Sequence, residues 1–191
     1  MKFKRLLAVL LTAVLLLGVV PRGTHILTKQ ELFHGPVGTV LRWAGQIPVD
    51  RANGRAALAA GLGVLGRGGA VGIFPEGNRG RGAVENVHAG AAWLAVHGDA
   101  PLVPVAILGT RLTGESLGHL PGVRRRLYVE FGEPVAPSRQ APVRASITAT
   151  SERLRAAMAA LVAVAQEHSG IALPGDDPRH PDADDPCPVS G

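Results

Sequence analysis

The chain has 191 residues, a length that suits a single domain with a buried core. Hydrophobic residues make up 46% and aromatic residues only 4%, so the core must be built mainly from Ala, Val and Leu. The single cysteine, Cys187, excludes an intrachain disulfide, and the histidines are too scattered to suggest a metal site.

The net charge of +5 is distributed unevenly. The segment 174–191 holds five aspartates against one arginine, so this tail carries −4 and the rest of the chain carries +9. A basic body favours phosphate-bearing partners, namely anionic lipid headgroups, phosphorylated substrates or nucleic acid. Charge alone does not separate these partners from an ordinary soluble surface. We predict that residues 171–191 form a disordered acidic tail.

The N-terminus begins with Met1-Lys2-Phe3-Lys4-Arg5 and continues as an apolar run over residues 6–20. This run is shorter than the ~20 residues that a spanning helix needs. A secretory signal has the same pattern, but no Ala-x-Ala cleavage site follows. We therefore predict an anchor helix over residues 1–21, with a secretory signal and a buried core helix as alternatives.

Strands and helices are predicted to alternate between these two ends. Apolar runs and period-2 alternation, bounded by Gly and Pro, predict strands at 25–28, 45–49, 70–74, 102–108 and 126–131. Helical spacing predicts helices at 33–43 (interrupted by Gly35-Pro36), 53–65, 84–96 and 146–167. This order is typical of an α/β domain with a mostly parallel sheet flanked by helices, here over residues 22–170.

The strand predicted at 70–74 runs into an acid and a base, Glu76 and Arg79, separated by Gly77. The mouth of such a strand is where ligands bind in open α/β sheets. Gly77 would allow a tight turn close to a ligand, and Arg79 offers a planar fork suited to phosphate. Glu76 would orient that arginine or bond an acceptor hydroxyl. The alternative is a turn with a surface ion pair.

This segment belongs to a set of four blocks. Phe74-Pro75-Glu76-Gly77-Asn78-Arg79 resembles the Phe-Pro-Glu-Gly-Thr-Arg motif of the 1-acylglycerol-3-phosphate and lysophospholipid acyltransferase family. The other three blocks are similar to further motifs of that family, in the same order and spacing: Thr28–Phe33, Gly45–Arg51 and Val103–Thr110. The resemblance therefore covers residues 14–135.

The resemblance implies a glycerol-phosphate acyltransferase-like core, and a reaction that moves a fatty acyl group from acyl-CoA or acyl-carrier protein to a lysophospholipid. It makes Arg51 and Lys29 further candidate phosphate contacts, although plain surface charge explains Lys29 nearly as well. It also implies a phospholipid membrane as partner, a location on the cytoplasmic side of that membrane, and no cofactor, metal or nucleic acid.

The chain departs from the family at the residues that perform catalysis. The family's Asn-His-x-x-x-x-Asp motif should lie near residues 8–13, which read Ala-Val-Leu-Leu-Thr-Ala. Neither His25 nor His34 has an aspartate at that spacing, so the sequence offers no replacement. Smaller departures are Asn78 for Thr, Gly80 for Ser and His88 for a lysine.

Acyl transfer needs a base for the acceptor hydroxyl, and a carboxylate that orients and stabilises an imidazole base. We therefore leave the catalytic residues unassigned and expect an impaired enzyme. The sequence is compatible with a truncated or altered form of an active enzyme, or with an inactive homologue that binds lipid phosphate.

Two other patterns suggest other activities. Gly114-Glu115-Ser116-Leu117-Gly118 resembles the nucleophile elbow of α/β-hydrolases, with Glu133 and His168 following in the required order. No strand directly precedes this elbow, so a serine esterase using Ser116 is kept only as the last alternative. A dinucleotide-type glycine pattern at 61–66 ends a predicted helix instead of opening one, and is rejected.

Overall fold

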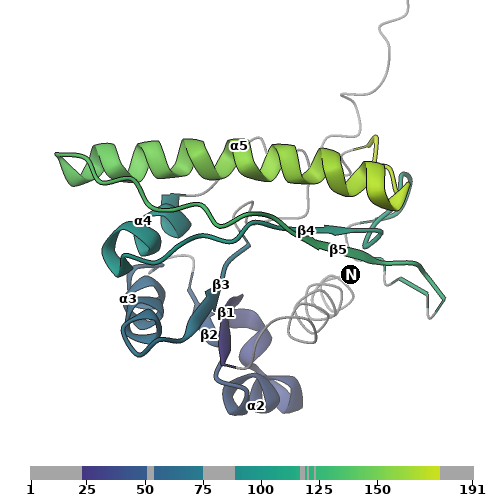
Figure 1. The fold of residues 1–191 in the computed structure, drawn as a ribbon. Coiled ribbons are helices and arrows are strands. Elements are labelled where there is room, and N and C mark those ends of the chain that lie inside the picture. The colour runs from purple at the N-terminus through teal and green to yellow at the C-terminus, as the bar shows by residue number, and fades with distance from the viewer. Residues whose placement is uncertain are drawn as a thin grey trace, which may run out of the picture.

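The computed structural model describes residues 23–50, 54–74, 89–116, 119, 121–122 and 124–176. The elements follow one another in the order β1 (Thr24–Lys29), the 3-10 turn η1 (Gln30–Phe33), α2 (Gly35–Trp43), β2 (Ile47–Val49), α3 (Gly54–Leu65), β3 (Ala70–Gly72), α4 (Ala89–Gly98), β4 (Val105–Leu108), β5 (Tyr128–Phe131) and α5 (Val143–Ser169). The predicted α/β class with a parallel sheet flanked by helices is confirmed (Figure 1).

The first three strands form a parallel sheet in the order β2-β1-β3. Lys29 lies opposite Val49, and Ile26 lies opposite Gly72, so the carboxyl ends of all three strands share one edge. Helix α3 packs against all three strands. The core between them is aliphatic, as the composition requires, and consists of Ile47, Ala57 and Val64 with Leu27, Val49 and Val71.

Two glycines allow the close packing around β1. A Cβ on Gly38 would come within 2.1 Å of the carbonyl carbon of Phe33, so only glycine lets α2 lie against η1. Gly45 has φ +68°, and its carbonyl oxygen lies 2.6 Å from His25 Nδ1. The neighbouring Gln46 accepts a bond from the Ile26 amide at 2.8 Å through its side-chain oxygen. These contacts fix the turn before β2 against the start of β1.

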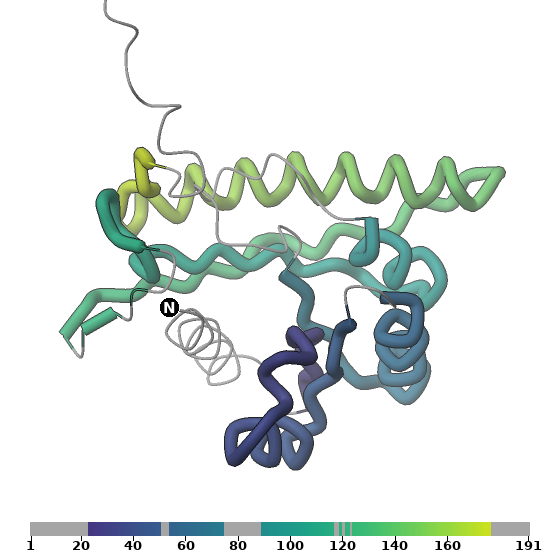
Figure 2. Tube along the Cα trace, turned by 180° about the vertical axis from the view of Figure 1, so that it is seen from behind, coloured from purple at the N-terminus to yellow at the C-terminus, as the bar shows by residue number. Residues whose placement is uncertain are grey.

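The C-terminal part of the chain forms a second layer. β4 and β5 pair antiparallel, with Val105 opposite Phe131 and Leu108 opposite Tyr128. The long helix α5 lies along this pair, and α4 packs between α5 and α3, as Figure 1 and the reverse view in Figure 2 show. One face of the strand pair and α5 enclose a second core of Ala106, Leu108, Leu161 and Ala165.

The packed domain extends past the predicted boundary at residue 170. Ile171 and Leu173 pack against the second core, and the amide of Gly175 donates to Thr113 Oγ1 at 3.0 Å. Asp176 binds the buried guanidinium of Arg111 at 3.0 Å. Residues 171–176 therefore do not belong to a disordered tail, because two apolar side chains and an ion pair hold them.

The predicted N-terminal apolar helix at 1–21 and the remainder of the acidic tail lie outside the described residues. Within the described part of the chain, no helix is both long and apolar enough to cross a membrane.

Candidate functional site

The site predicted from sequence centres on the edge where the three parallel strands end. Lys29 is the last residue of β1 and is half-buried, and Asp50 directly follows the last residue of β2. Ligands of open α/β sheets bind outside the carboxyl ends of the strands. Of the predicted contacts, Lys29 therefore lies at the expected edge.

The other predicted contacts lie outside the described residues. In the sequence, Arg51 comes two residues after the end of β2, and Glu76, Gly77 and Arg79 follow the end of β3. Each of these segments thus leaves a strand whose carboxyl end lies at the same edge as Lys29. Their roles as phosphate contacts stay predictions.

A pocket of about 240 Å³ opens beside this edge. Its wall comes from the η1 turn, from the start of α2 and from the end of β2, and is formed by Gln30, Glu31, His34, Val49 and Asp50. Four of these five side chains are polar or charged. The pocket can therefore make several hydrogen bonds to a hydroxylated ligand, since Glu31 and Asp50 accept hydrogen bonds and Gln30 also donates them, while Val49 supplies one apolar contact.

His34 enters this pocket because of the local fold. It is the residue that precedes α2, in an extended conformation (φ −103°, ψ 149°), and its side chain makes no capping bond to the helix. The contact of Gly38 with Phe33 holds α2 against η1, and Arg42 donates to the carbonyl oxygen of Phe33 at 2.7 Å. His34 is therefore held at a fixed turn with its imidazole exposed.

Sequence reasoning missed this grouping, because His34 and Asp50 are sixteen positions apart and meet only through the pairing of β1 with β2. The available signal was that His34 directly follows the block Thr28–Phe33, and that Asp50 lies inside the block Gly45–Arg51. His25, by contrast, starts β1 at the opposite edge, and its Nδ1 contacts the Gly45 carbonyl. It has a structural role in the turn.

The model of the acyltransferase family matches residues 8–108, which is more than half of the chain. The chain belongs to the acyltransferase family. The matched range takes in β1 through β4 and every residue that lines the pocket.

A solved structure supports the same fold. The crystal structure of the 1-acyl-sn-glycerophosphate (LPA) acyltransferase PlsC from Thermotoga maritima aligns with a TM-score of 0.51 at 24% identity. The alignment covers 77% of this chain and 60% of that chain, so this protein spans well under two thirds of the neighbour's length. No curated protein matches the sequence.

The family's His-x-x-x-x-Asp pair is missing from the matched range. No histidine occurs between residue 8 and His25, and no histidine from there to residue 108 has an aspartate five positions on. The acyltransferase match over residues 8–108 therefore assigns no catalytic base.

The residues considered for a hydrolase have other partners. His168 Nδ1 lies 3.0 Å from Glu130 Oε1, so the carboxylate beside this imidazole is Glu130 and not Glu133. Ser116 is exposed, and its carbonyl oxygen accepts a bond from the His119 amide. In the part of the chain that the structure describes, no hydrogen bond connects Ser116 with His168.

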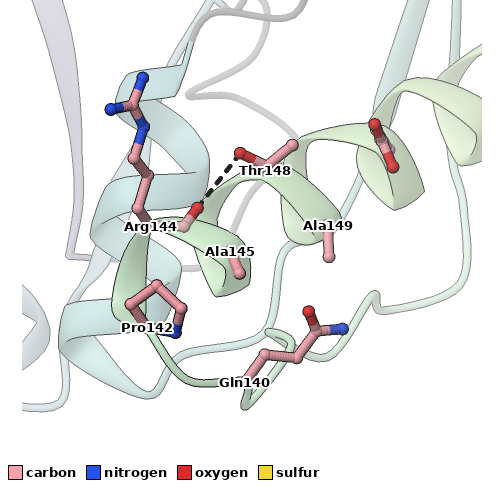
Figure 3. A pocket seen from close by; sticks show the side chains of 7 residues that line it. Gln140, Pro142, Arg144, Ala145, Thr148 and Ala149 are labelled. Atoms are coloured by element: carbon pink, nitrogen blue, oxygen red, sulfur yellow. Dashed lines mark hydrogen bonds between the residues drawn. The ribbon is translucent and has the colours of Figure 1, made fainter.

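A larger concavity of about 570 Å³ lies at the start of α5, far from these motifs in the sequence (Figure 3). All its lining residues belong to the segment 140–152, and none is a predicted site residue. The hydroxyl of Thr148 is already used, since it donates to the carbonyl oxygen of Arg144 at 3.1 Å. We therefore place the candidate site at the sheet edge and not at this hollow.

Among the described residues, no group of three His, Cys, Asp or Glu side chains is placed to hold a metal ion.

Proposed function

We propose that this protein transfers a fatty acyl group from an acyl thioester to a lysophospholipid of the 1-acylglycerol-3-phosphate type, at a rate below that of family members with a His/Asp pair. The observation that carries this proposal is that the acyltransferase match covers β1, β2 and β3, whose carboxyl ends share one edge, and that the described parts of two motif blocks, Thr28–Phe33 and Gly45–Asp50, reach this edge. The Thermotoga protein with the same fold is a 1-acyl-sn-glycerophosphate (LPA) acyltransferase.

The acceptor's phosphate is assigned to Lys29, Arg51 and Arg79. A phosphate needs several convergent cationic donors, and arginine offers two parallel N–H bonds to it. Gly77 would let the backbone approach the ligand, and Glu76 would accept a bond from an acceptor hydroxyl or orient Arg79. The half-buried position of Lys29 beside the pocket supports this arrangement.

The lowered rate follows from the missing motif. General acid–base catalysis contributes typically about 10²–10⁴-fold to a rate, so an acyltransferase without its usual base retains binding and positioning but loses a factor of that size. The second candidate, favoured by the same absence, is a homologue that binds lipid phosphate without turnover. A serine esterase would use Ser116 with Glu133 and His168. The structure does not support it, because His168 contacts Glu130 instead of Glu133.

The proposal includes the partners and the location. The donor would be acyl-CoA or acyl-carrier protein as a diffusible cosubstrate, with no bound cofactor. Because the acceptor is a membrane lipid and acyl-CoA is cytosolic, we place the protein at the cytoplasmic side of a phospholipid membrane.

Transfer of labelled acyl groups from acyl-CoA to lysophosphatidic acid in mixed micelles tests the proposal. We expect slow transfer by the wild-type protein, and weaker acceptor binding by Lys29→Ala. Arg139→Ala serves as a control, because Arg139 is exposed and pairs with Asp99 outside the acyltransferase blocks.

A protein that neither binds lysophosphatidic acid nor acylates it would refute the proposal. Binding without any transfer would instead favour the non-catalytic homologue. Labelling of Ser116 by a fluorophosphonate probe would favour the esterase.

A further inference from the structure

Among the side chains that line the pocket at the sheet edge are one imidazole and two carboxylates. His34 and Glu31 come from the η1–α2 turn, and Asp50 comes from the end of β2. This combination of groups is the one that acyl transfer requires, although the chain lacks the His/Asp pair at the family's position. Glu31 and His34 are close in the sequence, and the pairing of β1 with β2 brings Asp50 to the same pocket.

We propose that His34 is the general base of this protein and carries its acyl transfer. The inference rests on the proposed function, since it assigns a residue to that reaction. In the step, the His34 imidazole takes the proton from the acceptor hydroxyl while the hydroxyl oxygen attacks the thioester carbonyl carbon. The C–S bond of the tetrahedral intermediate then breaks, and the thiolate takes the proton back from the imidazolium, giving an ester and a thiol.

The other described histidines are engaged elsewhere. His25 contacts the Gly45 carbonyl at the amino end of β1, and His97 stacks on Trp93 with its Nδ1 2.9 Å from that residue's carbonyl oxygen. His119 lies 3.1 Å from Glu115, and His168 lies 3.0 Å from Glu130. Within the described part of the chain, His34 is thus the histidine that lines a pocket at the carboxyl edge.

The turn that joins Lys29 to His34 relates the base to the proposed phosphate contact. Lys29, a proposed phosphate contact, directly precedes the turn whose residues Gln30 and Glu31 line the pocket. If Lys29 binds the phosphate of a glycerol phosphate, the free hydroxyl of that ligand lies a few ångströms away. The turn that separates Lys29 from His34 has a similar dimension. Asp50 and Glu31 supply negative charge beside the imidazolium that forms during transfer.

The test compares full-length wild-type protein with His34→Ala, His34→Gln and His97→Gln in the labelled acyl-CoA assay, with lysophosphatidic acid binding measured in parallel. His34 is exposed and makes no cap bond, so its variants should fold, which a thermal melt checks.

We expect both His34 variants to lose about 10²-fold or more in turnover. Acceptor affinity should change less than about twofold, and His97→Gln should behave like the wild type. Added imidazole should restore part of the turnover of His34→Ala and none of that of His34→Gln, whose side chain fills the space.

Three outcomes overturn the inference. One is turnover by His34→Ala within about threefold of the wild type, because a lost base costs more. Another is a loss of acceptor binding that accounts for the whole loss of turnover, which makes His34 a binding residue. The third is a wild-type protein that binds lysophosphatidic acid and never acylates it. This outcome would support the proposed acceptor binding and refute the role of His34 as a base. Absence of binding as well would show that the proposed function itself has failed.

Discussion

The two layers of this molecule use charged side chains in different ways. In the layer of β4, β5 and α5, charges pair with one another: Arg111 with Asp176, Arg125 with Glu115, and His168 with Glu130. At the carboxyl edge of β1, β2 and β3, the ionisable side chains of Glu31, His34 and Asp50 line one open pocket. The comparison teaches that the first set holds the second layer together, while the second set lines the pocket at which we propose that the acceptor binds.

The pair of Arg111 and Asp176 should have the largest effect on stability. The Arg111 side chain is 5% exposed and donates to both carboxylate oxygens and the carbonyl of Asp176. Arg111→Ala should lower the free energy of unfolding by about 3 kcal/mol. This value is at the lower end of the losses seen when a buried ion pair is broken, because the Asp176 side chain is 31% exposed and water can solvate it.

Urea denaturation measures this change, with Arg139→Ala as the matched control. Arg139 and Asp99 are 79% and 66% exposed, so their pair should contribute at most a few tenths of a kcal/mol. Equal losses in the two variants would contradict a special role for the buried pair.

A smaller loss is expected at Thr150, which is fully buried in α5. Its hydroxyl donates to the Ser146 carbonyl at 2.7 Å and accepts from the Ser138 amide at 2.9 Å. Thr150→Val keeps the shape but leaves the Ser138 amide without its partner, which should cost about 1–2 kcal/mol in unfolding free energy.

Thr148→Val is the control, because the Thr148 hydroxyl is exposed and bonds only the carbonyl of Arg144 in its own helix (Figure 3). If Thr148→Val loses as much unfolding free energy as Thr150→Val, the hydrogen bond between the Ser138 amide and Thr150 is not the source of the loss.

The third effect concerns Glu115, and it depends on pH. The hydrogen bond from Arg125 lowers the pKa of Glu115 from 4.5 to about 2. A carboxyl with a lowered folded-state pKa stabilises the protein above its unfolded pKa, and this contribution disappears as the pH falls from about 4.5 to about 2.

Unfolding curves of wild type and Glu115→Gln at pH 7, 4 and 2.5 check this prediction. The wild type should be the more stable at pH 7, and the difference should shrink toward pH 2.5. A difference that stays constant over this range would mean that the carboxylate of Glu115 does not bind Arg125.

None of these three changes should alter acceptor binding, because all lie in the layer of paired charges. A change at Arg111 that weakens lysophosphatidic acid binding in the folded protein would show that the two layers are not separate in function.

Much of the fold was predictable from the sequence. Apolar runs bounded by Gly and Pro gave β2 and β3 to within a few residues, and helical periodicity gave α5. The direction of β5 was not predictable, since alternation of Val129 and Phe131 with Tyr128 and Glu130 marks a strand but says nothing of its partner.

The site was predictable in part. Motif blocks located Lys29 at a strand's end, because local sequence determines where a strand stops. The placement of His34 and Asp50 on one pocket depends on the register of β1 with β2, and the pairing of Arg111 with Asp176 joins residues 65 positions apart. Such contacts arise from packing and have no signal in local spacing.

The central claim is that the carboxyl edge of β1, β2 and β3 binds a lipid phosphate. The most direct test is the affinity of wild type, Arg79→Ala and Arg139→Ala for lysophosphatidic acid at low and high salt. We predict that Arg79→Ala binds more weakly and with less dependence on salt, while Arg139→Ala binds like the wild type. Equal affinity of all three proteins at both salt concentrations would contradict the claim.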